Sequence, residues 1–264
     1  MFAVLETETV PRRFCLWRAA VTAGERELPH YLCVTLEVPI GARIKDMRGR
    51  VVRAFRYISR AGIKGIVLPP AFPYAALAET FGLTVSSPVP LLRRMAAAMC
   101  RHAAETAGVP WERIRLSLIS RRSTPELLNT AQTLASEARA VHIAAGEDSE
   151  AVCYLLRSQY GVSASAHPVK HSEGFFDIFI IYEAPPQKLP VPDGALVLNL
   201  AGGVPALSGG RAADGALLEP PRSLLREWPE GCDNAAMLAA LVAEGQLSPA
   251  EITVRGLTLG GLPV

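Results

Sequence analysis

The sequence lacks the short motifs by which most catalytic and phosphate-binding sites are recognised. G-x-G-x-x-G, G-x-x-x-x-G-K-[ST], G-x-S-x-G and H-E-x-x-H are all absent from its 264 residues. Each of these motifs positions a phosphate, a nucleophile or a zinc ion. Their absence excludes phosphate, nucleophile and zinc sites of the kinds that these motifs define. No general acid, base or nucleophile stands out either. The sequence therefore leaves open whether the protein is an enzyme.

Long apolar runs and clustered cysteines are also missing. Half of the residues are hydrophobic, yet no stretch approaches the roughly 20 consecutive apolar residues of a membrane-spanning helix. The N-terminal residues carry acids and no basic region ahead of an apolar one, so we expect no signal peptide and no membrane partner. The five cysteines are Cys15, Cys33, Cys100, Cys153 and Cys232. They lie far apart and never in C-x-x-C spacing, so the sequence indicates neither a metal site nor a disulfide framework. We therefore expect reduced thiols in a cytoplasmic protein.

The net charge of +2 conceals a division along the chain. Residues 1–124 carry 19 Lys and Arg against 9 Asp and Glu, whereas residues 125–264 carry 8 against 16. A predicted helix over residues 46–61 bears a basic stripe opposite its apolar face. The arginines of this stripe are Arg50, Arg53, Arg56 and Arg60. No interleaved aromatics support nucleic-acid binding, so the stripe is either a solvated face or a protein-interaction surface.

Short apolar segments alternate with amphipathic ones along the chain, which is typical of an α/β fold. We expect strands within residues 1–40 and at 65–70, 83–90, 114–120, 140–146, 162–168, 176–182, 195–200 and 252–257. The expected helices are 41–62, 73–82, 91–108, 125–138, 149–160 and 232–245. A Gly- and Pro-rich stretch after residue 200 is expected to form a long surface loop. We therefore predict two α/β units, residues 1–110 and 111–264.

The segment from residue 114 to about 203 resembles the nucleotide-binding domains of NAD(P)-dependent dehydrogenases, ornithine cyclodeaminase and glutamyl-tRNA reductase. A first strand runs into a helix at residues 120–125, acids follow the second strand, and FDIFIIYEAPP is followed by PDGALVLNLAGG. The resemblance implies a Rossmann-like domain with a mostly parallel sheet in the order 3-2-1-4-5. Where those families place three glycines against the pyrophosphate, this chain has Arg121, Arg122 and Ser123.

The best candidate for a ligand site is this junction between strand and helix. The free N–H groups and the dipole of a helix start favour an anion, and guanidinium and hydroxyl groups add donors. Ligands of open α/β sheets bind at the carboxyl ends of the strands. The predicted ligand-binding residues are Ser120, Arg121, Arg122, Ser123, Thr124, Glu147, Asn199 and Gly202, and Asp148, Tyr182, Glu183 and Gly203 are expected at the same crevice. The alternative is an ordinary capped helix with solvated arginines.

Three functions are compatible with these patterns. The first is binding of a phosphorylated small molecule or nucleotide by a degenerate Rossmann-like domain, in a regulatory or scaffolding role. The second is an NAD(P)-dependent oxidoreductase, in which Arg121 and Arg122 would fit the 2′-phosphate of NADP better than a plain ribose. The third is a protein-interaction module that uses the basic helix 46–61, and a homo-oligomer is left open. No metal site is expected, because His167 and His171 lack further ligands.

Overall fold

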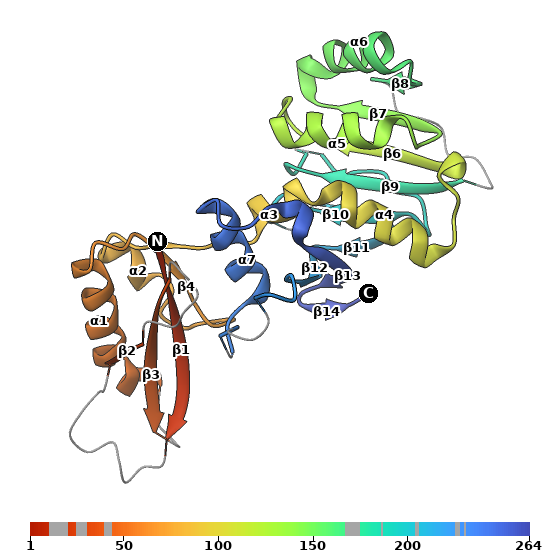
Figure 1. The fold of residues 1–264 in the computed structure, drawn as a ribbon. Coiled ribbons are helices and arrows are strands. Elements are labelled where there is room, and N and C mark those ends of the chain that lie inside the picture. The colour runs from red at the N-terminus through yellow and green to blue at the C-terminus, as the bar shows by residue number, and fades with distance from the viewer. Residues whose placement is uncertain are drawn as a thin grey trace. The chain divides into compact units, whose positions relative to one another are not determined.

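The computed structural model describes residues 1–10, 21–24, 31–39, 44–166, 175–185, 187–203, 206–224, 228–229 and 231–264 (Figure 1). These residues form two compact units. Unit 1 comprises residues 1–88 and 220–252, and unit 2 comprises residues 89–219 and 253–264. Both units are α/β and contain parallel sheets, as the sequence predicts. The boundary expected near residue 110 lies within unit 2.

Unit 1 is built on a five-stranded sheet in the order β2-β3-β1-β4-β5. Its strands are β1 (Phe2–Val10), β2 (Val21–Gly24), β3 (Tyr31–Pro39), β4 (Gly65–Val67) and β5 (Thr84–Val85). β1 pairs in parallel with β3 and β4, and β4 pairs in parallel with β5. Only β2, which is antiparallel to β3, departs from this direction among the described strands.

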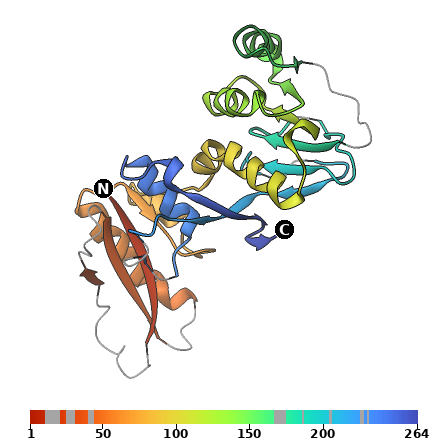
Figure 2. The same ribbon diagram turned by 45° about the vertical axis from the view of Figure 1, so that its right-hand side comes forward.

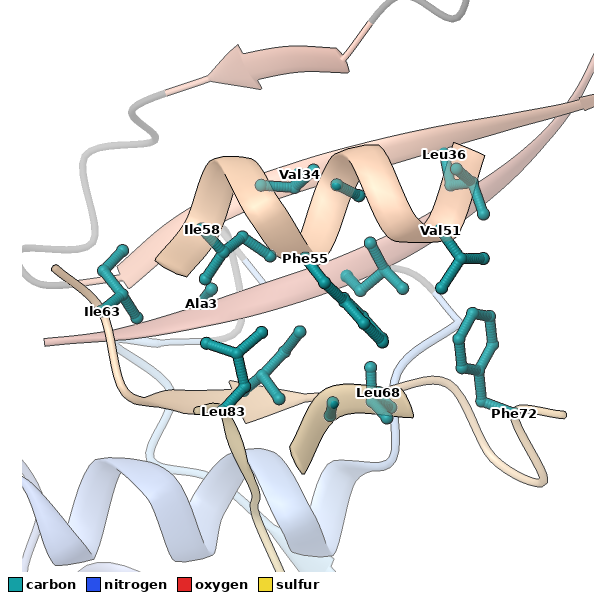
Figure 3. Close-up of a cluster of buried hydrophobic side chains, with 14 residues drawn as sticks. Ala3, Val34, Leu36, Val51, Phe55, Ile58, Ile63, Leu68, Phe72 and Leu83 are labelled. Atoms are coloured by element: carbon teal, nitrogen blue, oxygen red, sulfur yellow. The ribbon is translucent and has the colours of Figure 1, made fainter. Parts of the chain in front are cut away.

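The core of unit 1 lies between this sheet and α1 (Ile44–Arg60), as Figure 3 shows. Val51, Phe55 and Ile58 recur at the three- and four-residue spacing of one helix face, and all three are fully buried. They pack with buried residues of β1 and β3. The predicted apolar face of this helix is thus confirmed. Arg53, Arg56 and Arg60 are exposed on the other side.

Two further helices belong to unit 1. α7 (Asn234–Ala243) returns to this unit late in the chain and contacts β4. Asp233 caps it by accepting hydrogen bonds from the N–H groups of Ala235 and Ala236, as its position in the sequence indicates. α2 (Leu77–Thr80) is shorter than the predicted helix 73–82, because the residues before it form turns.

Unit 2 contains a six-stranded parallel sheet, called sheet B here, in the order β11-β10-β9-β6-β7-β8. Its strands are β6 (Ile114–Ile119), β7 (Ala140–Ala144), β8 (Ala164–Ser165), β9 (Phe176–Ile181), β10 (Leu196–Asn199) and β11 (Arg211–Ala213). The helices α3 (Val89–Arg94), α4 (Ala96–Ala107), α5 (Pro125–Ala135) and α6 (Ser149–Tyr160) pack against one another beside this sheet (Figures 1 and 2). Among the described residues, the connections from β9 to β10 and from β10 to β11 contain no helix.

Two expectations for unit 2 are corrected by the structure. The helix expected over 91–108 is divided at Met95, whose backbone leaves the helical region with φ −92° and ψ 4°. The loop expected after residue 200 contains β11 and β12 (Gly215–Glu219). These strands are too short for a readable alternation, and their partners are distant: β12 pairs with β13 (Thr253–Leu259), which also pairs with β14 (Leu262–Pro263). No helix in the described ranges is long and apolar enough to cross a bilayer.

Candidate functional site

The loop of residues 120–124 joins the carboxyl end of β6 to the start of α5, as the sequence predicts. Ser120 is buried, and its N–H donates to the carbonyl of Ala144 at the end of β7 (2.8 Å). Thr124 has extended backbone and caps α5, because its Oγ1 accepts a hydrogen bond from the N–H of Leu127 (3.2 Å). Pro125 then occupies the first helical turn, where its missing N–H costs nothing. The loop is therefore anchored at both ends, and Arg121 and Arg122 between them are exposed.

A carboxylate from β9 occupies the position expected for an anion beside this loop. Glu183 follows β9, and its Oε2 accepts hydrogen bonds from the backbone N–H of Arg121 (3.1 Å) and from Ser120 Oγ (3.3 Å). The guanidinium Nε of Arg121 donates to the carbonyl of Ala184 (3.3 Å). Glu183 thus holds the first half of the loop against the exit of the neighbouring strand.

A second carboxylate holds the other half of the loop. Asp148 Oδ2 accepts a hydrogen bond from the N–H of Ser123 (2.8 Å). Asp148 lies in a short 3-10 helix (Gly146–Asp148) that follows β7, and Glu147 beside it is exposed. Backbone donors predicted to bind a phosphate are therefore already bonded to the protein's own acids. An anionic ligand would have to use the arginine side chains or displace a carboxylate.

Gly146 supplies the close backbone approach that three glycines in the loop itself provide in the Rossmann motif. Its φ of +59° lies in the left-handed region, and a Cβ at this position would lie 2.3 Å from the carbonyl oxygen of Arg121. The glycine that permits tight packing at this edge therefore follows β7 instead of β6. A glycine after the second strand belongs to no recognised motif, so its role could not be predicted from the sequence.

Arg93 is a further cation at the carboxyl ends of sheet B, and the sequence analysis did not select it. It lies in the last turn of α3 and donates from Nη2 to the carbonyl of Tyr182 (2.5 Å) and from Nε to the carbonyl of Leu200 (3.0 Å). Those carbonyls directly follow β9 and β10. Arg93 therefore holds the carboxyl ends of two adjacent strands in place. The only sequence feature that could have indicated this role is the pair of arginines, Arg93 and Arg94, near the end of a helix.

Tyr182 was expected to face the crevice, and this prediction is wrong. The side chain is fully buried, and its hydroxyl donates to Thr130 Oγ1 of α5 (2.6 Å). Burial raises the pKa of this phenol above its usual value. Tyr182 thus belongs to the packing between β9 and α5, because successive residues of a strand point to opposite faces of the sheet.

Asn199 and Gly202 shape the turn that follows β10. Asn199 Nδ2 donates to the carbonyl of Gly203 (2.6 Å), and its Oδ1 accepts from the N–H of Ala201 (3.3 Å). Gly202 is exposed with φ +75°. The polar amide predicted to bind a ligand therefore has local backbone partners. The side-chain oxygen and nitrogen of Asn199 thus hold the turn of residues 199–203 in place.

No protein-family model matches the chain, and no curated protein is similar to it. The site is therefore interpreted from its geometry alone. In the parts of the chain that the structure describes, no three His, Cys, Asp or Glu side chains are grouped so that they could hold a metal ion. His167 and His171 lie outside the described residues.

Proposed function

We propose that unit 2 is a Rossmann-like domain that binds a phosphorylated small molecule or a nucleotide at the carboxyl ends of β6, β7 and β9. The strand order of sheet B supports this proposal. Counted along the chain from β6, the order β8-β7-β6-β9-β10 corresponds to 3-2-1-4-5. The connections from β6 and β9 thus proceed in opposite directions across the sheet, and ligands of open α/β sheets bind where the direction changes.

The groups at this edge favour a ligand with both a phosphate and hydroxyl groups. Arg121 and Arg122 extend from the 120–124 loop and are exposed, so their guanidinium groups can reach a phosphate while the loop N–H groups stay bonded to Glu183 and Asp148. Glu147 is an exposed acid beside them, and carboxylates accept hydrogen bonds from sugar hydroxyls. The ligand we expect places its phosphate on the arginines and its sugar toward Glu147.

A regulatory or scaffolding role fits this edge better than catalysis. The carboxylates of Glu183 and Asp148 and the hydroxyls of Ser120 and Thr124 already have local partners at this edge, where they fix the loop. Glu183, for example, accepts hydrogen bonds from both Ser120 Oγ and the N–H of Arg121, so its carboxylate holds the loop in place. Ligand binding that secures the loop between β6 and α5 is the activity these contacts support.

The first test is thermal unfolding of the whole chain with ATP, GTP, sugar phosphates, NAD and NADP. A ligand at about 100 times its dissociation constant adds roughly 2.7 kcal/mol of stability if it binds only the folded state. For a chain of this size we expect a rise in the unfolding midpoint of about 2 °C or more. A rise with NADP alone would replace this proposal with the oxidoreductase alternative. No rise with any of these compounds would contradict it.

Variants locate the binding site within unit 2. Arg121→Ala with Arg122→Ala should abolish the shift caused by the best ligand, whereas Arg139→Ala, another exposed arginine of unit 2, should leave it unchanged. Glu183→Gln keeps an oxygen acceptor for the N–H of Arg121 and removes a negative charge. It should therefore tighten the binding of an anion several-fold. Unchanged affinity in the double alanine variant would place the ligand elsewhere.

A further inference from the structure

Unit 2 has a second concave site at the opposite ends of the strands of sheet B. A cavity of about 690 Å³ lies against the beginnings of β9, β10 and β11, and α4 and β13 complete its wall. This volume is within the range of small-molecule pockets, which is about 300–1,000 Å³. The 120–124 loop follows the carboxyl end of β6, so the two sites use opposite edges of the same sheet.

Most of the cavity wall is apolar. α4 contributes Ala103 and Ala107, and β9 and β10 contribute Phe176 and Leu196. Leu217 of β12 also lines the cavity and is 44% exposed. A hydrocarbon that entered the cavity would remove this apolar surface from water, and such burial favours binding.

The charged side chains that line the cavity are two arginines, Arg211 and Arg255. Arg255 is paired with Glu219 of β12. Arg211 makes no ion pair with any residue that the structure describes. Its backbone is fixed in β11, because its N–H donates to the carbonyl of Ala195 (2.7 Å). The cavity therefore combines an apolar wall with a guanidinium that forms no ion pair with a carboxylate of the described residues.

We propose that this cavity binds a medium-chain alkyl carboxylate, with the alkyl chain along α4 and β9 and the carboxylate on Arg211. A guanidinium presents a planar pair of donors that matches the two oxygens of a carboxylate. A neutral alcohol would bury its alkyl chain against the apolar wall but would leave the Arg211 guanidinium without an anion. An alkylammonium would be repelled by both arginines. This site is independent of the ligand proposed for the 120–124 loop.

The test is isothermal titration of the whole protein with decanoate, decanol and decylammonium, each below its aggregation concentration. We expect decanoate to bind with a stoichiometry of one and at least tenfold more tightly than decanol, and decylammonium not to bind. Equal affinities for decanoate and decanol would overturn the proposal, because the arginine would then play no part. Absence of decanoate binding would overturn it as well.

Three variants assign the affinity to this cavity. Arg211→Ala should lower the affinity for decanoate to that for decanol, and Arg211→Lys should have an intermediate affinity. Arg113→Ala removes an exposed arginine that does not line the cavity and should bind decanoate as the parent protein does. Ala103→Leu, which adds volume at the wall, should weaken both decanoate and decanol. If Arg211→Ala and Arg113→Ala bind decanoate equally, the proposal is wrong, whatever the effect of Ala103→Leu.

Discussion

At the scale of the residue, Gly146 is the position least tolerant of a side chain at the candidate site. We predict that Gly146→Ala lowers the free energy of unfolding by about 2 kcal/mol or more, because it adds strain at positive φ and a contact with the carbonyl of Arg121. Gly161→Ala is a matched control: its φ is +65°, but a Cβ there meets no atom within 4 Å. It should lose about 1 kcal/mol. Urea unfolding measures both, and equal losses would contradict the close approach.

The hydroxyl of Tyr182 is a second single group whose removal has a calculable effect. Tyr182→Phe leaves Thr130 Oγ1 in the core without the donor that it has now. We expect the protein to lose about 1–2 kcal/mol of stability. Tyr154→Phe, at a side chain that is 72% exposed in the same unit, should be neutral. Thermal unfolding of the two variants side by side would show the difference. A Tyr182→Phe variant as stable as Tyr154→Phe would mean that the hydrogen bond contributes nothing.

At the scale of the element, an ion pair links two neighbouring strands of sheet B. Arg115 of β6 and Asp177 of β9 are register partners and make two hydrogen bonds, Nε to Oδ1 (2.7 Å) and Nη2 to Oδ2 (2.8 Å). Their side chains are only 7% and 11% exposed. The guanidinium also lies 5.0 Å from the centre of the Phe175 ring. Each of these two buried charges is therefore compensated by the other.

Removing one partner of this pair should cost far more than removing both. Arg115→Leu or Asp177→Leu leaves a buried charge without this ion-pair partner, so each should lose about 3–5 kcal/mol. The double variant replaces the pair with apolar groups and should be much more stable than the sum of the single losses implies. A cycle of urea unfolding measurements on the four proteins decides this. Additive losses would show that the two charges do not interact.

The same pair shows which features of the elements the sequence could predict. The start of α5 at Thr124 and Pro125 and the cap of α7 at Asp233 were predictable, because capping depends on residues within one turn. The pairing of Arg115 with Asp177 was not, because the two residues meet only after the order of the strands is known. The sequence predicts that Glu183 and Asp148 lie near the 120–124 loop, because all three segments follow the carboxyl ends of parallel strands. Their hydrogen bonds to its N–H groups depend on distances that no spacing encodes.

At the scale of the whole molecule, the chain leaves unit 1 after residue 88 and returns to it for residues 220–252. These two segments of unit 1 are joined by the packing of α7 against β4 and by a hydrogen bond from Ser86 Oγ to the carbonyl of Ala236 (2.9 Å). The sequence predicts a single division of the chain, because turn-rich segments mark where a chain can change direction but not to which core it returns. An interleaved chain of this kind is defined by contacts between residues more than a hundred positions apart.

Buried titratable groups in both units give the molecule a common response to alkaline pH. Burial raises the pKa of the Cys100 thiol and of the Tyr182 phenol, both in unit 2, and raises that of Cys232 in unit 1 to about 11. Each group holds its proton more tightly in the folded chain than in the unfolded one, where a thiol titrates near 9.0. Above about pH 9 the unfolded state therefore binds fewer protons than the folded state, and the free energy of unfolding falls as the pH rises.

For one fully protected thiol this fall is at most about 1.4 kcal/mol per pH unit above its unfolded pKa. We therefore predict that the thermal midpoint is steady from pH 7 to 8.5 and declines between pH 9 and 10.5 under reducing conditions. Cys100→Ala removes the thiol that is wholly buried in α4, so its midpoint should start lower but decline less steeply than that of the parent. Parallel declines in the two proteins would assign the alkaline sensitivity to other groups. A shallower decline in the variant would show that the proton on this thiol is coupled to folding, which is what its position at 0% exposure requires.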